Sequence, residues 1–295
     1  MNTVNPTREL AVFLRTRRER LHPGDVALPA RRAPRRTPGL RREEVAELAG
    51  VSVDYVTRLE QGRGLRPSPE VLEALAGALR LSEDERAYLY DLAGQRPARQ
   101  RTARRTPTAD DEAGPLARLV ADLSPLPAML VNHRFDIISW NAEMAALMLD
   151  FGTLPPEQRN SMWLCVRHPG LRGFYRDREH IIREGIADLR AAWAAHPDDT
   201  ALSSLIDELT SSSEEVARLW ALRDVKVNAR GHKRLVHDAE GPLTVAYEVL
   251  APLQAPGQRL VIYRAADPES QRVLDAVVRA SPAARPRGSA VSAPG

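Results

Sequence analysis

Arginine is the residue type whose chemistry stands out first in this chain. Residues 31–42 read RRAPRRTPGLRR and hold six arginines, two prolines and no acidic residue. Closely spaced guanidinium groups repel one another, and each of them can bind phosphate oxygens through paired hydrogen bonds. Such a segment needs water or a counter-charge beside it, so it is either a disordered basic linker or a shaped part of a binding site, and the rest of the chain must decide between the two.

The charge is distributed unevenly along the 295 residues. Residues 1–106 hold 21 arginines and 14 acidic residues, a balance of +7, whereas residues 107–295 hold 21 basic and 25 acidic residues, a balance of −4. The two balances sum to the formal net charge of +3. A basic front part and a mildly acidic back part predict two modules with different tasks, the first of them for a polyanion.

Residues that could catalyse a reaction or hold a metal ion are scattered. The single cysteine, Cys165, excludes an intrachain disulfide and a cysteine-based zinc cage. Cys165 and His168 have a spacing compatible with neighbours on a helix, but they lack a third group to orient them. The chain has no HExxH pair, Walker loop or GxGxxG motif. We therefore expect no enzyme, no metal and no cofactor.

The sequence also lacks features that would direct it to a membrane. No apolar run approaches the roughly 20 residues that span a bilayer, and the N-terminus has no basic-then-apolar signal pattern. We therefore expect a cytoplasmic protein that has no membrane partner.

Helical spacing of apolar residues dominates the first part of the chain. Ser52, Ser68 and Ser82 stand where N-caps are expected, and Ser82 with Glu85 fits a capping box. The pattern predicts an all-α domain over residues 1–94 with five short helices, at 9–21, 41–48, 53–61, 69–79 and 83–92. Residues 95–115 are rich in Arg, Pro, Thr and Ala and read as a linker.

The second part of the chain alternates between strand and helix patterns. Residues 129–141 predict two strands around a turn, followed by a helix from Asn141 through Leu149, and residues 156–222 predict a long helical region. Further strands are expected at 224–228, 232–237, 243–250 and 258–264. Residues 116–266 are therefore predicted to form an α+β domain with an antiparallel sheet. Residues 267–295 read as a tail that is largely disordered after residue 280.

The most informative segment is LRREEVAELAGVSVDYVTRLEQG, residues 40–62. Gly50 suits a left-handed turn between two helices, and Ser52 can cap the second of them. With Val56 and Leu59 facing inward, the outer face of the second helix presents Val53, Asp54, Thr57 and Arg58. This is the helix-turn-helix pattern, in which the second helix enters the DNA major groove.

The first of these two helices carries a local clue to an anion. It begins with Arg41 and Arg42, although the helix dipole disfavours cations at that end. Glu43 and Glu44 supply the preferred sign one step later. A phosphate at this helix start would explain the two arginines, since backbone N–H groups and guanidinium groups then bind it together.

The segment resembles the helix-turn-helix domains of the Cro/phage-repressor-like (XRE) family. The resemblance implies that Val53, Asp54, Thr57 and Arg58 read base edges, with Arg58 suited to guanine and Asp54 either to cytosine or to a local cap. It also implies a structural ion pair of Arg18 with Glu60. The residues expected along the DNA backbone, or in a minor-groove arm over residues 31–38, are Arg31, Arg32, Arg35, Arg36, Thr37, Arg41, Arg42, Ser52, Tyr55, Gln61 and Arg63.

Further stretches widen the resemblance to nearly the whole chain. FLRTRRERL, PSPEVLEALAGALRL, LSPLPAMLVNHRFDIISWN and GPLTVAYEVL together look like an XRE subfamily that is fused to an MmyB-like ligand-binding domain. Such domains are described as PAS-like, and members are thought to sense an apolar small molecule such as a fatty acid. The residues then expected to line a pocket, of which the apolar ones are more commonly plain core residues, are Trp140, Met144, Leu147, Met148, Phe151, Arg159, Asn160, Met162, Trp163, Phe174, Trp193, Trp220 and Tyr247.

Two residues of that set are polar and have their own alternatives. Arg159 and Asn160 could anchor a ligand carboxylate, or they could serve as scaffolding at a helix start. The sequence as a whole predicts a homodimer that reads a palindromic operator in double-stranded DNA and responds to a small apolar effector. The open alternatives are a second domain that binds another protein or dimerises without a ligand, and an enzyme with a DNA-binding anchor.

Overall fold

The computed structural model describes residues 5–26, 39–63, 66–95 and 114–280. Contacts divide the chain into an N-terminal unit, residues 1–102 with 186–227, and a sheet unit, residues 103–185 with 228–295. The division falls inside helix α10 (Arg178–Ala195), between Gly185 and Ile186. The sequence predicts a single domain over residues 116–266. Residues 186–227 group instead with the N-terminal helices, because the side chains of this segment pack against those helices.

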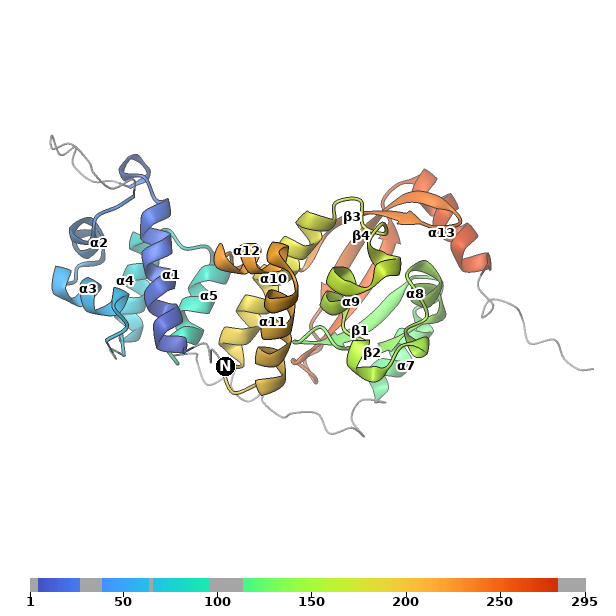
Figure 1. Ribbon diagram of the computed structural model, residues 1–295, viewed down its shortest axis with the longest axis horizontal. Coiled ribbons are helices and arrows are strands. Elements are labelled where there is room, and N and C mark those ends of the chain that lie inside the picture. The colour runs from blue at the N-terminus through green and yellow to red at the C-terminus, as the bar shows by residue number, and fades with distance from the viewer. Residues whose placement is uncertain (1–4, 27–38, 64–65, 96–113, 281–295) are drawn as a thin grey trace, which may run out of the picture. The chain divides into compact units, whose positions relative to one another are not determined.

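The N-terminal unit contains the five helices that the sequence predicts, with ends shifted by a few residues. The first begins at Pro6 rather than Glu9, because the Asn5 side chain caps it by accepting a hydrogen bond from the Thr7 amide at 2.9 Å. Phe13, Leu72 and Leu89 are fully buried where these helices meet. The helices, which Figure 1 labels, are α1 (Pro6–Arg20), α2 (Arg42–Ala49), α3 (Val53–Glu60), α4 (Pro69–Ala78) and α5 (Glu83–Leu92), and the short 3-10 turn η1 (Pro23–Asp25) follows α1.

The remainder of the N-terminal unit comes from later in the chain. It holds the end of α10, then α11 (Thr200–Ser212) and α12 (Glu214–Ala221), whose starts are capped by Asp199 and Ser213. The helical region expected over 156–222 is thus broken into several helices by these caps. In Figure 1 the helices α10, α11 and α12 lie next to α5.

The strand predicted at residues 224–228 is wrong, because these residues form no regular structure. They pack instead on the N-terminal helices: the Asp224 carboxylate pairs with Arg20 at 3.0 Å, and the Val227 amide donates to the Asp84 carboxylate at 3.1 Å. Val225 is buried whereas Val227 is 42% exposed. The alternation of apolar residues there does not reflect one buried strand face.

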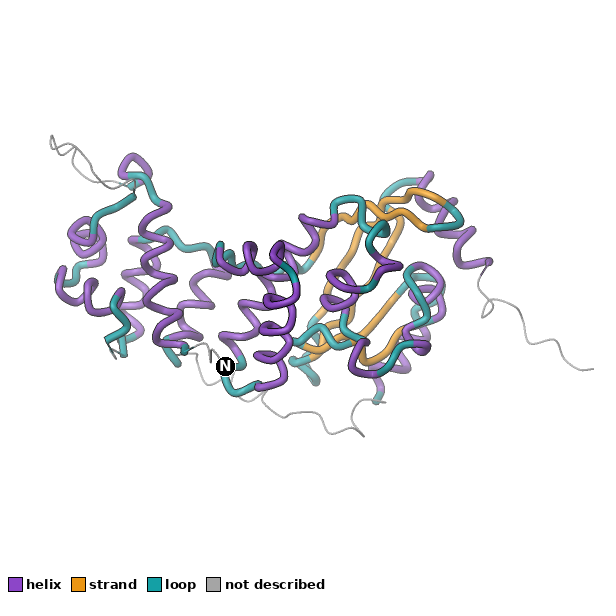
Figure 2. Tube along the Cα trace, viewed as in Figure 1, coloured by secondary structure: helices purple, strands orange, loops and turns teal. Residues whose placement is uncertain are grey.

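The sheet unit is built on five antiparallel strands in the order β2-β1-β5-β4-β3. The two strands that come last in the sequence, β4 and β5, therefore lie between β1 and the edge strand β3. Figure 2 shows the strands of this sheet in orange. The antiparallel sheet that the sequence predicts is confirmed. Its strands are β1 (Ala128–Asn132), β2 (Ile137–Trp140), β3 (Arg230–His237), β4 (Gly241–Leu250) and β5 (Gln258–Ala265).

Helices and turns pack against the sheet. Val120 from α7 (Pro115–Asp122) forms a buried cluster with Ala128, Leu130 and Leu260. Asn141 caps α8 by accepting from the Met144 amide at 3.0 Å and also accepts from the Ala128 amide at 2.9 Å, so one side chain links strand and helix. The other elements are α8 (Ala142–Leu147), α9 (Ser161–Arg167) and the 3-10 turns η3 (Phe151–Thr153), η4 (Pro156–Gln158) and η5 (Pro169–Leu171).

Helix α13 (Pro268–Ala280) corrects the prediction of a tail from residue 267. The Asp267 carboxylate accepts a hydrogen bond from the Ser270 amide at 2.8 Å, which holds the first turn. Leu274 and Val277 are buried, and the Ser270 hydroxyl accepts from the Thr244 amide of β4 at 2.9 Å. The predicted disorder after residue 280 lies outside the described residues.

Candidate functional site

The turn between α2 and α3 has the geometry that the sequence indicates. Gly50 ends α2 in the left-handed conformation, with φ of 63°, which an L side chain rarely adopts. The Ser52 hydroxyl then accepts from the Tyr55 amide at 3.1 Å and starts α3. Val56 and Leu59 are buried beneath α3, so its opposite face is presented to the outside.

That outer face carries the four residues predicted to read bases. Val53 is 41% exposed, Asp54 and Arg58 are exposed, and Thr57 is half-buried. The Thr57 hydroxyl donates to the Val53 carbonyl at 2.8 Å, which leaves its methyl group for apolar contact.

The two charged side chains of this face are available for DNA. Within the described ranges, neither Arg58 nor Asp54 has an ion pair or a side-chain hydrogen bond. Ser52, not Asp54, caps the helix, so the local capping role weighed for Asp54 is not used. Arg58 can therefore meet guanine N7 and O6 without first breaking a bond inside the protein.

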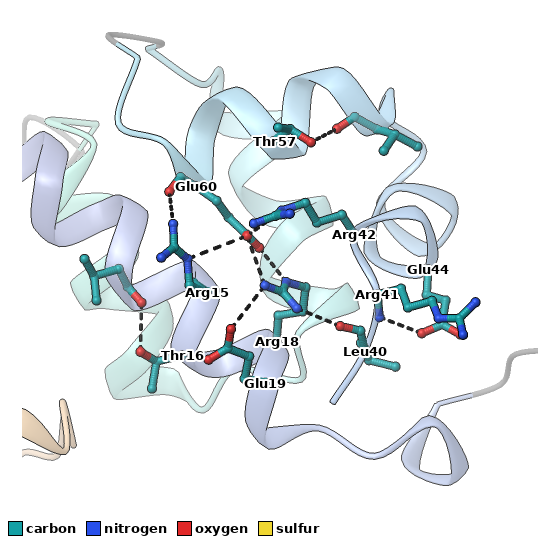
Figure 3. A network of polar contacts seen from close by, with 12 residues as sticks. Arg15, Thr16, Arg18, Glu19, Leu40, Arg41, Arg42, Glu44, Thr57 and Glu60 are labelled. Atoms are coloured by element: carbon teal, nitrogen blue, oxygen red, sulfur yellow. Dashed lines mark hydrogen bonds and ion pairs between the residues drawn. The ribbon is translucent and has the colours of Figure 1, made fainter. Parts of the chain in front are cut away.

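Beneath α3 lies a cluster in which three arginines surround the buried carboxylate of Glu60. Arg18 donates to both of its oxygens, at 2.6 and 3.1 Å, so the predicted partners are brought together. Arg42 donates to one of them at 2.8 Å, and Arg15 donates to the Glu60 backbone carbonyl at 2.8 Å. Figure 3 shows these side chains converging from α1, α2 and α3.

The single negative charge of Glu60 does not balance the positive charges of the three arginines in this cluster. Arg18 is buried and also meets Glu19 at 3.4 Å, whereas the side chains of Arg15 and Arg42 are 43% and 40% exposed. Among the described residues, the Nη groups of Arg42 have no partner, because only its Nε is engaged. The exposed rim of the cluster therefore keeps an excess of positive charge next to the start of α2.

The start of α2 is also neutralised in part from within the protein. The Glu44 carboxylate accepts a hydrogen bond from the Arg41 amide at 2.7 Å, which satisfies one free amide at the helix start and places a negative charge there. The Glu60 carboxylate offsets the charge of Arg42, so this arginine has a counter-charge within the protein. The helix N-terminus and the excess charge beside it still favour an anion.

The segment that connects α1 to α2 is held against α1 at Gly39 and Leu40, just before α2 begins. Gly39 lies so close to α1 that a Cβ there would be 2.5 Å from the Glu19 backbone. The Leu40 amide donates to the Arg18 carbonyl at 3.1 Å, and Arg18 returns a bond to the Leu40 carbonyl at 2.8 Å. The arm residues Arg31, Arg32, Arg35, Arg36 and Thr37 lie outside the described residues.

The remaining backbone candidates lie at the ends of α3. Ser52 is engaged as the N-cap, and Tyr55 is half-buried, with its pKa raised by burial. Gln61 and Arg63 are exposed just after the helix. Both ends of α3 therefore present polar groups on either side of the proposed reading face.

Comparison with known families agrees with this geometry. The description "Helix-turn-helix domain" matches residues 9–89, and "MmyB-like transcription regulator ligand binding domain" matches residues 113–277. The second match alone covers more than half of the chain. The chain belongs to the MmyB-like transcription regulators. No curated protein matches the sequence.

A helix-turn-helix DNA-binding domain and a ligand-binding domain in one chain make this MmyB-like protein a ligand-modulated transcription regulator. None of its described helices is long and apolar enough to cross a membrane. In the same ranges, no group of three His, Cys, Asp or Glu side chains is arranged to hold a metal ion.

The residues predicted to line a pocket divide between the two units of the regulator. Trp140 packs edge-on against Phe151 with ring centroids 5.4 Å apart, and both belong to the sheet unit. Trp193 and Trp220 belong instead to the N-terminal unit. Of the others, the buried ones are Met144, Leu147, Met162, Phe174 and Tyr247, and the half-buried ones are Met148 and Trp163.

Arg159 and Asn160 are engaged in holding the fold of the sheet unit. Arg159 donates to the Leu154 carbonyl at 3.0 Å and lies over the Trp140 ring. Asn160 caps α9 and donates to the Asp136 carboxylate at 2.9 Å. These contacts favour the scaffolding interpretation over the carboxylate anchor.

A second buried ion pair, missed by the sequence analysis, joins α1 to the later helices of the N-terminal unit. Arg190 of α10 donates to the Glu9 carboxylate at 2.5 Å, and both side chains are buried. Tyr88 donates to the same carboxylate at 3.1 Å, and burial raises the pKa of Tyr88, which keeps it a donor. Arg190 also lies 3.9 Å from the centroid of the Trp220 ring and donates to the Trp220 carbonyl. Partners so far apart in sequence leave no periodic signal.

A neighbouring contact strengthens the same attachment. Arg17 donates to the Arg223 carbonyl at 2.6 Å and pairs with Glu85 at 2.8 Å. Burial lowers the pKa of Arg17, although the negative charge of Glu85 raises it in part. Arg190 and Arg223 lie within the residues that match the ligand-binding domain, and both bind side chains of α1. This part of the chain therefore holds α1, the helix that precedes the helix-turn-helix.

Proposed function

We propose that this MmyB-like regulator is a cytoplasmic homodimer that reads a palindromic operator and responds to a small apolar acid, such as a fatty acid. The observation that carries the DNA part is the outer face of α3, where Arg58 is exposed and has no described partner. A dimer is expected because helix-turn-helix proteins commonly bind two half-sites about one helical turn apart. The chain is proposed to have no catalytic activity.

The backbone contacts follow from the charge around α2 and α3. The exposed guanidinium groups of Arg42 and Arg15 lie beside the start of α2, where phosphate is favoured. The segment over residues 31–38 is proposed to follow the DNA backbone or to enter a minor groove. Gly39 fixes its returning end on α1, which would keep the arm close to the motif.

The response to a ligand is proposed to pass through α10. This helix begins in the sheet unit and ends in the N-terminal unit, where Arg190 is paired with Glu9 of α1. A ligand that shifts α10 could act on α1 through this pair. It would change DNA affinity only by binding the DNA-competent and incompetent states unequally.

Replacement of Arg58 by alanine tests the reading face. We expect R58A to weaken operator binding by about 1–3 kcal/mol and to relax the preference at one base position per half-site. Selection of bound duplexes from a randomised pool, run with the wild type and with R58A, measures both effects.

Arg63→Ala is the matched control, since Arg63 is an exposed arginine just beyond α3. It should weaken binding to all sequences alike and leave the selected motif unchanged. An R58A motif identical to that of the wild type would remove Arg58 from the reading face. Failure of the wild type to enrich any motif would contradict the proposed operator recognition.

The main alternative is a second domain that dimerises or binds a protein and takes no ligand. Native mass spectrometry of freshly purified protein separates the two proposals. A co-purifying small molecule supports the ligand, and its absence together with a protein partner supports the alternative.

A further inference from the structure

Three tyrosine rings surround the side chain of Lys233 in the sheet unit. The Lys233 Nζ lies 4.8 Å from the ring centroid of Tyr247, 5.2 Å from that of Tyr263 and 5.8 Å from that of Tyr175. It donates a hydrogen bond to the Tyr263 hydroxyl at 2.9 Å. Lysine occurs at only two positions in the chain, among 42 basic residues, and one of them occupies this site.

The strands and one connecting segment position the three rings. Tyr247 of β4 and Tyr263 of β5 are direct partners across the sheet, and Tyr175 forms a bridge to Leu235 at the edge of β3. Gly231 makes room for Tyr247, since a Cβ there would lie 2.9 Å from the ring. All three tyrosines are buried, so the site is fixed by the packing of the sheet unit.

The positive charge of Lys233 lacks an acidic partner within the described part of the chain. No carboxylate there forms an ion pair with it, and its one hydrogen bond goes to the Tyr263 hydroxyl. Its side chain is only half-exposed. The faces of tyrosine rings attract a cation, but an ammonium group has three N–H donors, and two of them are left for an incoming acceptor.

Neighbouring hydroxyl groups can add to such an interaction. Burial raises the pKa of Tyr175 well above its usual range, so this phenol keeps its proton. Hydroxyl groups beside an ammonium group suit an oxyanion, because each of them can donate a hydrogen bond to it.

We infer that Lys233, with the hydroxyl groups of Tyr175 and Tyr263, is the anchor for the carboxylate of an apolar acid bound on this face of the sheet. The inference rests on the proposed function and specifies where its ligand is held. Val249 and Val261 are the next cross-strand pair on the same face of the sheet, two residues along β4 and β5 from Tyr247 and Tyr263. An apolar tail laid along this row would leave its carboxylate at Lys233.

A comparison of matched probes tests the anchor. Full-length protein freed of lipid is titrated with dodecanoate and with dodecanol, which share a tail and differ in head group. The wild type should bind dodecanoate about tenfold or more tightly than dodecanol, because a charged hydrogen bond is gained. Lys233→Met should lose that preference while its dodecanol affinity stays unchanged.

Two variants keep the test sharp. Arg159→Met removes another cation that lies over an aromatic ring, and it should retain the preference for dodecanoate. If K233M does not fold, K233Q removes the charge and keeps a hydrogen-bonding group, and it carries the same comparison. Far-ultraviolet circular dichroism checks each variant's fold.

The outcomes separate the anchor from the proposed function. A K233M protein that still prefers dodecanoate overturns the anchor and leaves an apolar acid as the ligand. Equal wild-type affinities for the two probes overturn the anchor and leave an apolar ligand without an acid group. A wild type that binds neither probe overturns the ligand class of the proposed function, and the anchor with it.

Discussion

Replacement of Glu60 by glutamine is expected to lower the free energy of unfolding of the N-terminal unit by about 3–5 kcal/mol. The substitution keeps the shape of the side chain but removes the charge that Arg18 meets at 2.6 and 3.1 Å. Arg18 is buried, so its guanidinium would stay in place next to Arg42 and Arg15, with only the more exposed Glu19 as a counter-charge. Urea unfolding followed by circular dichroism measures the loss as a lower midpoint.

Glu73→Gln provides the matched control for this effect. Glu73 pairs with Arg86 on the surface, where both side chains are about half exposed, at 54% and 41%. Loss of such a pair should cost less than about 1 kcal/mol. An E60Q protein that unfolds at the same urea concentration as E73Q would contradict the structural role of the Glu60 cluster.

The second large effect is expected from Arg190→Met. Methionine fills part of the same volume, but Glu9 would then be buried with only the Tyr88 hydroxyl at 3.1 Å and Arg223 at 3.7 Å. Breaking a buried pair by removing one partner typically costs about 3–5 kcal/mol. We expect R190M to destabilise the N-terminal unit by that amount in the same urea assay.

A double variant shows whether the cost comes from the orphaned charge. Glu9→Gln combined with R190M removes both charges and should recover part of the lost stability, since the two residues are coupled. If R190M unfolds like the wild type, or if the double variant loses the sum of the single effects, the pair does not fasten α1 to α10.

The local parts of the fold could be predicted from the sequence because short-range signals encode them. Ser52, Ser68 and Ser82 marked helix starts, and each accepts a hydrogen bond from an amide three residues on. Gly50 marked the turn, and alternation marked β3, β4 and β5. These signals predicted which residues of α3 are exposed and which are buried.

One omission came from a signal that was present but not used. Asp267 and Pro268 form a helix start, with proline at the first position and an acceptor for the Ser270 amide. Leu274 and Val277 then follow at helical spacing on the buried side. This pattern could have identified α13 from the sequence.

Other features depend on contacts between distant residues. Val225 and Val227 alternate like strand residues, but Asp84 and Arg20 bind that segment from far away in the sequence. The pairing of Glu9 with Arg190, and the gathering of three tyrosines around Lys233, arise only when the chain is folded. In the sequence, the single hint of the site at Lys233 was that lysine occurs at only two positions.

The central claim is that a ligand of the sheet unit alters DNA binding by the helix-turn-helix. Its most direct test is the affinity of the full-length protein for its selected operator, measured at one salt concentration with lipid-free protein and again with saturating dodecanoate. We expect a difference of about fivefold or more, in the range typical of allosteric coupling. Equal operator affinities in the two states, with dodecanoate shown to be bound by native mass spectrometry, would contradict the claim.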